Sequence, residues 1–197
     1  MKKFVGIIVA TVLAFSLVGC GPVDSAIQNI ASSGSNTSGK SGVVTADDDG
    51  YAEGRMGDVM RTYFFDYTVN SAYTCNDYEG YTPSEGNKLL VAEITVKNTD
   101  RSTVTMYDTD FQIQWGEGDS DYGTCLNAVD DTMMPYAYEL TPGQERSDWL
   151  MAEIPDGSTS CTIAYQEYKT DGSKGDAYFV AVSYTHLRAH ETGRNLV

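Results

Sequence analysis

Carboxylates are the side chains of this chain with the most obvious capacity for chemistry. Several occur in pairs inside segments with the composition of loops: Asp108 and Asp110, Asp119 and Asp121, and Asp130 and Asp131. Glycosidases use two converging carboxyl groups, and calcium takes about six to eight oxygen ligands. The spacing of an EF-hand is absent, so Asp119 and Asp121 are the only calcium candidates we name. Acids also favour turns for local reasons, and solvated loop charges are the alternative. No metal centre and no cofactor is predicted.

The two histidines of the chain, His186 and His190, are spaced so that one face of a helix could present both to a metal. Leu187 stands where the usual metalloprotease motif has its glutamate. No other histidine is available as the base of a Ser-His-Asp or Cys-His arrangement, and no glycine-rich phosphate loop precedes a helix. The sequence therefore predicts a protein that is not an enzyme.

The N-terminus has the layout of a secretory signal. Two lysines follow the first methionine, and an apolar run then extends over residues 4–17. That run is short for a membrane-spanning helix. The sequence Leu17-Val-Gly-Cys20 resembles the lipobox of bacterial lipoproteins. The resemblance implies that residues 1–19 are a signal peptide and that Cys20 carries diacylglycerol and palmitate.

Lipidation of Cys20 would make the cell membrane a partner and would hold the protein at its extracytoplasmic face. The alternative is an uncleaved apolar anchor in which this cysteine is incidental. The net charge of -15 argues against nucleic acid as a partner, because a phosphate backbone would be repelled. It fits a soluble extracellular surface.

A polar segment follows the signal. Residues 20–58 show little apolar pattern and include a Gly/Ser-rich run at 32–42 and three consecutive acids at 47–49. Such a segment cannot bury enough apolar surface to offset its ordering entropy. We expect a flexible, disordered linker over 20–58 and a folded domain over 60–182.

The domain has the pattern of short strands at close spacing. The clearest is 88–98, where Leu90, Ala92, Ile94 and Val96 alternate with more polar residues. Further strands are expected over 61–74, 103–107, 110–115, 146–154, 161–168 and 177–182, and residues 122–128 are a candidate for one more short strand. About seven strands and no helical period predict an all-β fold, an immunoglobulin-like β-sandwich.

The strand 86–98, the turn Leu140-Thr-Pro-Gly143 and the segment 149–155 together resemble a known bacterial domain. It is the immunoglobulin-like domain of unknown function found after a lipobox and a Ser/Gly linker in many Gram-positive lipoproteins. That domain is grouped with the secreted mycobacterial immunoprotective extracellular antigen. The resemblance covers about residues 60–182. Its motifs are structural and the family has no agreed catalytic residues, so none is transferred.

Three cysteines lie beyond the lipobox. In a seven-strand order, Cys75 ends the first strand and Cys161 begins the sixth, which places both at one end of the sandwich. An oxidising compartment allows a disulfide there, so Cys75 and Cys161 are the predicted pair. Cys125 is then free, or is a partner if the strand register differs.

Tyrosines form the other group of interest, because tyrosine gives a large contact area at little entropic cost. Those that could line a recognition surface are Tyr63, Tyr67, Tyr73, Tyr78, Tyr81, Tyr136 and Tyr138. The alternative is that they pack in the core with a hydroxyl at the rim.

Residues 183–197 change character and hold both histidines with a single acid. They resemble a tail that arises when sequencing-adapter DNA is translated. We interpret them as an artefactual or disordered tail, and the alternative is a genuine basic extension.

These features together favour a membrane-anchored extracytoplasmic lipoprotein with a non-catalytic domain that binds a protein or another cell-envelope partner. The alternatives are a structural or chaperone-like envelope protein and an enzyme acting on wall glycans.

Overall fold

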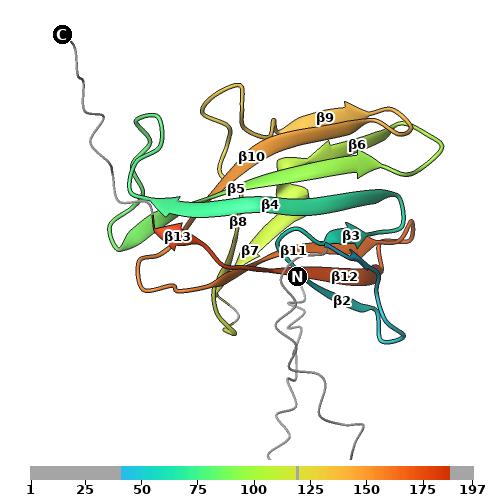
Figure 1. Cartoon of the computed structure of the whole chain (residues 1–197), viewed down its shortest axis with the longest axis horizontal. Coiled ribbons are helices and arrows are strands. Elements are labelled where there is room, and N and C mark those ends of the chain that lie inside the picture. The colour runs from blue at the N-terminus through green and yellow to red at the C-terminus, as the bar shows by residue number, and fades with distance from the viewer. Residues whose placement is uncertain (1–40, 119, 187–197) are drawn as a thin grey trace, which may run out of the picture. The chain divides into compact units, whose positions relative to one another are not determined.

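The strands of the chain form two sheets that pack as a sandwich, with a two-stranded ladder beside them. The computed structural model describes residues 41–118 and 120–186. Figure 1 shows the two sheets as an upper and a lower layer. In the described ranges the one helical element is the 3-10 turn η1 (Asp108–Asp110). The prediction of an all-β sandwich is confirmed.

The path of the first sheet runs, in spatial order, through β1 (Val43–Val44), β3 (Val59–Arg61), β4 (Phe65–Cys75), β5 (Asn87–Asn98) and β10 (Glu145–Pro155). A sixth strand, β13 (Thr185–His186), pairs in parallel with the end of β4. β5 is hydrogen-bonded on both sides, since it runs antiparallel to β4 and to β10. The strand predicted over 88–98 is therefore an inner strand of this sheet.

The second sheet runs through β2 (Tyr51–Arg55), β12 (Lys174–Val182), β11 (Cys161–Tyr168), β7 (Phe111–Gln114) and β8 (Tyr122–Thr124). The separate ladder pairs β6 (Val104–Tyr107) with β9 (Ala137–Leu140). Of these strands, the sequence pattern indicated all but β2 and β9. No helix in the part of the chain that the structure describes is long and apolar enough to cross a membrane.

The core lies between the two sheets. The predicted inward residues of β5, namely Leu90, Ala92, Ile94 and Val96, all belong to it. Fully burying a large aliphatic side chain contributes roughly 1.5–3 kcal/mol. Aromatic rings join the sheets, because Tyr165 of β11 meets Phe65 of β4 edge-on at 4.8 Å between ring centroids. This core fixes the face that each strand turns outward.

A second, smaller cluster covers the outer side of the first sheet. It contains Leu89, Val91, Met133 and Met151, all buried. Leu89 and Val91 alternate with the core residues of β5, so this part of the strand is buried on both faces. The prediction that β5 is half-buried therefore fails at its N-terminal end, because the segments around Tyr78 and Met133 fold over it.

The folded domain begins earlier than the sequence predicts. β1 and β2 lie inside the segment 20–58 that we expected to be a flexible linker, so that boundary is wrong. β1 pairs in parallel with β3 in the first sheet, and β2 pairs in parallel with β12 in the second. Both strands are short, and each forms the edge of its sheet. Their hydrogen-bond partners, β3 and β12, come later in the chain. No local alternation marks them.

Two further boundaries differ. The strand predicted over 61–74 begins at Phe65, because residues 62–64 form a turn between β3 and β4. Residues 183–186, which we placed in the tail, are described with the domain: the Tyr184 hydroxyl donates to the Ser158 carbonyl at 2.7 Å. The signal peptide, Cys20, residues 20–40 of the linker and residues 187–197 lie outside the described residues.

Candidate functional site

The cysteines do not form the predicted pair. Cys75, Cys125 and Cys161 are all free thiols. Cys75 packs with the small cluster outside the first sheet, whereas Cys161 belongs to the core between the sheets. The prediction of a Cys75–Cys161 disulfide is therefore wrong, because the two thiols lie on opposite faces of the first sheet. Burial raises the pKa of the Cys161 thiol to about 12, so it is not a nucleophile at neutral pH.

Of the two calcium candidates, the structure describes only Asp121. Asp119 lies outside the described residues, and the Asp121 carboxylate accepts a hydrogen bond from the Gly118 amide at 2.9 Å. Asp121 thus has a local role in its turn. Within residues 41–118 and 120–186, no group of three or more histidine, cysteine, aspartate or glutamate side chains could hold a metal ion.

Asp108 and Asp110 lie on η1 between the ladder and the second sheet. Burial raises the pKa of both carboxyl groups. The Asp110 carboxylate accepts the Tyr107 amide at 2.8 Å, whereas Oδ1 of Asp108 is buried and has no hydrogen-bond partner among the residues described. Asp110 therefore stabilises the turn. The buried surroundings of Asp108 disfavour the charged form of its carboxyl group.

The tyrosines separate into core residues, covering residues and exposed residues. Tyr67 and Tyr138 belong to the core, while Tyr73, Tyr78 and Tyr81 pack over the small outer cluster. Of the seven tyrosines named from the sequence, the two left exposed are Tyr63 and Tyr136. Of the two interpretations given for these tyrosines, packing therefore holds for five, because strand alternation and the covering loops bury them.

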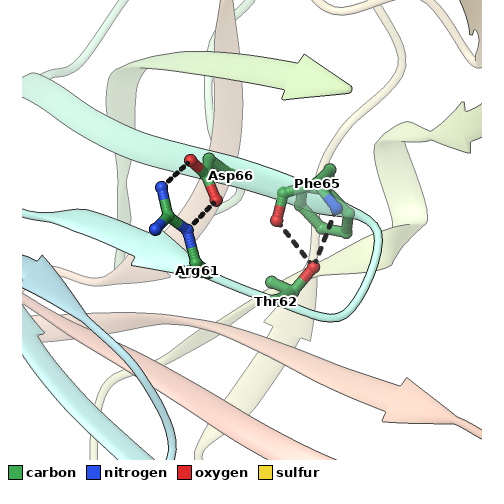
Figure 2. Close-up of polar contacts among 4 residues, drawn as sticks. All are labelled: Arg61, Thr62, Phe65 and Asp66. Atoms are coloured by element: carbon green, nitrogen blue, oxygen red, sulfur yellow. Dashed lines mark hydrogen bonds and ion pairs between the residues drawn. The ribbon is translucent and has the colours of Figure 1, made fainter. Parts of the chain in front are cut away.

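Tyr63 stands at the tip of the turn between β3 and β4, with 90% of its area exposed. Figure 2 shows the hydrogen bonds inside this turn. The Thr62 hydroxyl donates to the Phe65 carbonyl at 2.7 Å and accepts the Phe65 amide at 3.2 Å. Arg61 and Asp66 then close the base of the turn with two hydrogen bonds, at 3.1 and 2.9 Å.

The same turn is held from both sheets. On one side, the Tyr63 amide donates to Glu167 Oε1 of β11 at 2.7 Å. On the other, the Phe64 carbonyl accepts the amides of Thr99 and Asp100, which follow β5, at 3.0 and 3.1 Å. The backbone is therefore fixed while the Tyr63 ring is free. A rigid element that presents an exposed aromatic ring has the character of a binding anchor, because little entropy is lost when the ring is buried by a partner.

A hollow lies at the other end of β4. It is open, has a volume of about 480 Å³, and is lined by Thr74, Asn76, Lys88, Asp156 and Tyr184. The Lys88 ammonium donates to the carbonyls of Asp156 and Ser158 at 2.9 and 2.7 Å. Its charge therefore holds the turn between β10 and β11, so we assign this lysine a structural role.

In a strand that began at residue 61, Tyr63 would lie on the same face as Phe65 and Tyr67. The turn removes it from that face. The available signal was the polar pair Arg61-Thr62 before the aromatic run, because threonine favours turns through its hydroxyl.

Residues 55–176 match a family described as a domain of unknown function, DUF4352. The chain belongs to this family. The match covers more than half of the chain and nearly all of the sandwich. No curated protein matches the chain in sequence.

Among solved structures, the domain is similar to the ycdA protein of Bacillus subtilis, described as a "putative lipoprotein", with a TM-score of 0.52 and 12% identity. That match covers 64% of this chain and only 38% of the other. The yjhA protein of Bacillus subtilis matches with a TM-score of 0.51 and 14% identity, over 67% of this chain and 99% of that one.

The secreted protein MPT63 of Mycobacterium tuberculosis matches with a TM-score of 0.50 and 15% identity, over 66% of this chain and 95% of that one. At such low identities these likenesses show a shared fold. They support the resemblance to a β-sandwich family.

Proposed function

We propose that this member of the DUF4352 family is a lipid-anchored, extracytoplasmic protein whose sandwich is a non-catalytic binding domain. The anchor is Cys20, which follows an apolar run of signal-peptide length. The lipoprotein and secreted-protein descriptions of ycdA and MPT63 support that location. Residues 20–40 serve as the spacer between membrane and domain.

The observation that carries the binding role is the fixed turn with Tyr63 exposed at its tip. A partner protein with an apolar pocket and a carbonyl or carboxylate acceptor at its base would bury the ring and satisfy its hydroxyl. Aromatic residues placed in this way are frequent hot spots, each costing about 2 kcal/mol or more when truncated. The partner is expected in the cell envelope, where the anchor would hold the domain.

The test is photo-crosslinking in living cells from a reactive amino acid placed at position 63 of the full chain. A matched probe replaces Tyr136, which is also exposed, at 67%. We expect a discrete crosslinked partner from position 63 and none from position 136. Tyr63→Ala should then lower the affinity for that partner at least about 30-fold. Equal or absent crosslinking from the two positions would favour a structural envelope role instead.

The anchor is tested separately by the intact mass of the protein from the membrane fraction. We expect a chain that begins at Cys20 and carries acyl mass, and we expect Cys20→Ser to release the protein from membranes. An unmodified chain that retains residues 1–19 would contradict the anchor and would leave the Tyr63 result standing.

A further inference from the structure

The outer face of the second sheet carries a continuous set of uncharged side chains. Strand register places the following on that face, and we call them the neutral face: Thr162, Ala164 and Gln166 of β11, Ala177, Phe179 and Ala181 of β12, Gln112 and Gln114 of β7, and Tyr122 and Thr124 of β8. Their neighbours along each strand point into the core, as Ile113, Ile163 and Val180 do.

The neutral face contrasts with the chain as a whole, whose net charge is -15. Two charged side chains of the edge strand β2, Glu53 and Arg55, lie beside it. They are of opposite sign, so together they add no net charge. An anionic polymer finds no electrostatic attraction at the neutral face and is repelled by the acidic rest of the protein. A cationic partner would be attracted to the acidic surfaces elsewhere on the protein. The charge pattern favours a neutral partner.

The size of the neutral face argues against a second copy of the chain. The five strands of this sheet, at about 4.8 Å spacing and with two or three outward residues each, span at most roughly 20 Å by 15 Å, or about 300 Å² for each partner. Stable protein interfaces bury about 800 Å² for each partner. A narrow polymer lying across the strands needs no such area.

The chemistry of the neutral face suits hydroxyl groups. Gln112 and Gln114 present amides, and Thr124 and Thr162 present hydroxyls, so both donors and acceptors are available. Gln166 is already engaged, since its amide donates to three backbone carbonyls at 3.0, 3.0 and 3.1 Å.

Aromatic rings lie at both sides of this polar strip. Tyr51 of β2 stacks on Phe179 at 6.3 Å between ring centroids. Tyr122 of β8, 55% exposed, stands at the opposite edge. These rings can pack against the C–H faces of sugar rings while the amides between them bind hydroxyls.

We propose that the neutral face binds a neutral polysaccharide that lies across strands β2, β12, β11, β7 and β8. This site is separate from the Tyr63 turn, and the inference stands whether or not the proposed protein partner exists. The surface offers binding groups and no catalytic pair, so the polysaccharide is held and not cleaved.

The test uses the full chain purified in a polyoxyethylene detergent, which carries no sugar headgroup. Retention is measured on insoluble neutral polysaccharides (chitin, a β-glucan and a mannan) and on the anionic polygalacturonate. We expect retention on at least one neutral polymer and none on the anionic one. Gln112→Glu keeps the shape of the side chain and adds a charge, and it should weaken retention at least tenfold, as should Tyr122→Ala.

Thr105→Glu is the matched control, because Thr105 is an exposed residue of β6 outside this sheet. It adds the same charge and should leave retention unchanged, as should Tyr63→Ala. Thermal unfolding of each variant verifies that it is folded. Failure to retain any neutral polymer, or equal losses in Gln112→Glu and Thr105→Glu, would overturn the proposal.

Two other occupants give distinct results. A concentration-dependent dimer in sedimentation that is lost in Gln112→Glu would assign the neutral face to a second copy. Retention that begins only after residues 21–40 are deleted would assign it to that segment of the chain. Either result would overturn the polysaccharide site in the native protein.

Discussion

Asp108 is the residue whose surroundings conflict most with its chemistry. Only 2% of its area is exposed, and one of its carboxylate oxygens is buried without a hydrogen-bond partner in the described part of the chain. Burial raises the pKa of its carboxyl group above the usual 3.8. The folded state therefore binds this proton more tightly than the unfolded state does, and ionisation of Asp108 lowers the stability of the fold.

We predict that Asp108→Asn raises the free energy of unfolding by about 1 kcal/mol at pH 7, because the amide removes a buried charge. The direction of the pH dependence follows from the raised pKa of the Asp108 carboxyl group. The contribution of the wild-type carboxyl group is most favourable below 3.8 and is lost as the pH rises through its folded pKa. The gain in the variant should therefore shrink as the pH falls from 7 toward 4.

Urea unfolding of both proteins at these two pH values measures the effect. Asp131→Asn is the control, since Asp131 is exposed and its replacement removes the same charge. A gain in Asp108→Asn that is no larger than in this control, or that is independent of pH, would contradict the prediction.

The cysteines show what sequence position alone leaves undecided. Cys75 and Cys161 were predicted to meet because both lie at strand ends, and strand ends are readable from the sequence. The face that each side chain takes depends on the register. Cys75 is paired with Leu89, which points away from the core, while Cys161 is paired with Val182, which points into it. A shift of one residue would have reversed either side chain.

At the scale of elements, Asn98 joins three segments at the end of β5. It is fully buried. Its side-chain amide donates to the carbonyls of Ser102 and Leu140, both at 2.8 Å, and its Oδ1 accepts the Asp100 amide at 2.7 Å. The end of β5, the loop before β6 and the end of β9 are therefore connected through one side chain.

We predict that Asn98→Asp lowers the free energy of unfolding by about 2–4 kcal/mol at pH 7, because a carboxylate oxygen would face two carbonyl oxygens in a buried site. Denaturant unfolding monitored by tryptophan fluorescence is the measurement. Asn70→Asp is the matched control: Asn70 is exposed and donates to the Thr95 hydroxyl, which can donate in return. A similar loss of stability in Asn98→Asp and Asn70→Asp would contradict the structural role that we assign to Asn98.

The elements that the sequence predicted well are those with long alternation. β5, β10 and β11 each have an alternating apolar pattern, and the structure places them within one or two residues of the expected ranges. β2 and β9 were missed for a different reason. They are short, and each is stabilised by pairing with a partner that is distant in sequence. Their local composition carries no strand signal that outweighs their glycine, proline and acidic neighbours.

At the scale of the whole domain, residues 43–55 connect the two sheets at their edges. β1 borders the first sheet and β2 borders the second. Ala52 belongs to the core, and Val44 and Ala46 pack against it. This segment therefore covers the edge of β12, which would otherwise present unpaired backbone groups.

We predict that deletion of residues 41–55 lowers the free energy of unfolding by about 3 kcal/mol or more and promotes aggregation through the exposed edge of β12. Deletion of residues 21–40 should leave stability unchanged. Thermal unfolding and light scattering of the two variants provide the comparison. Equal stability of both deletion variants would restore the predicted boundary at residue 58.

The fold class was accessible from the sequence, whereas the interaction surfaces were not. Alternation and turn residues report on burial, which decides the sandwich. Tyr63 became a candidate anchor only because Glu167 and the residues after β5 hold its turn from two sheets. The neutral face likewise depends on the register of strands that are far apart in the chain. Both surfaces depend on pairing between strands that are distant in sequence, so no local segment predicts them.

The free thiols have a consequence for how the domain can be handled and where it can fold. With Cys75, Cys125 and Cys161 unbridged, the sandwich derives its stability from packing and hydrogen bonds and gains nothing from an oxidant. Its folding is therefore independent of the redox potential of the compartment. The domain should reach the same native state in a reducing cytosol as outside the cell, and dithiothreitol should not shift its unfolding midpoint.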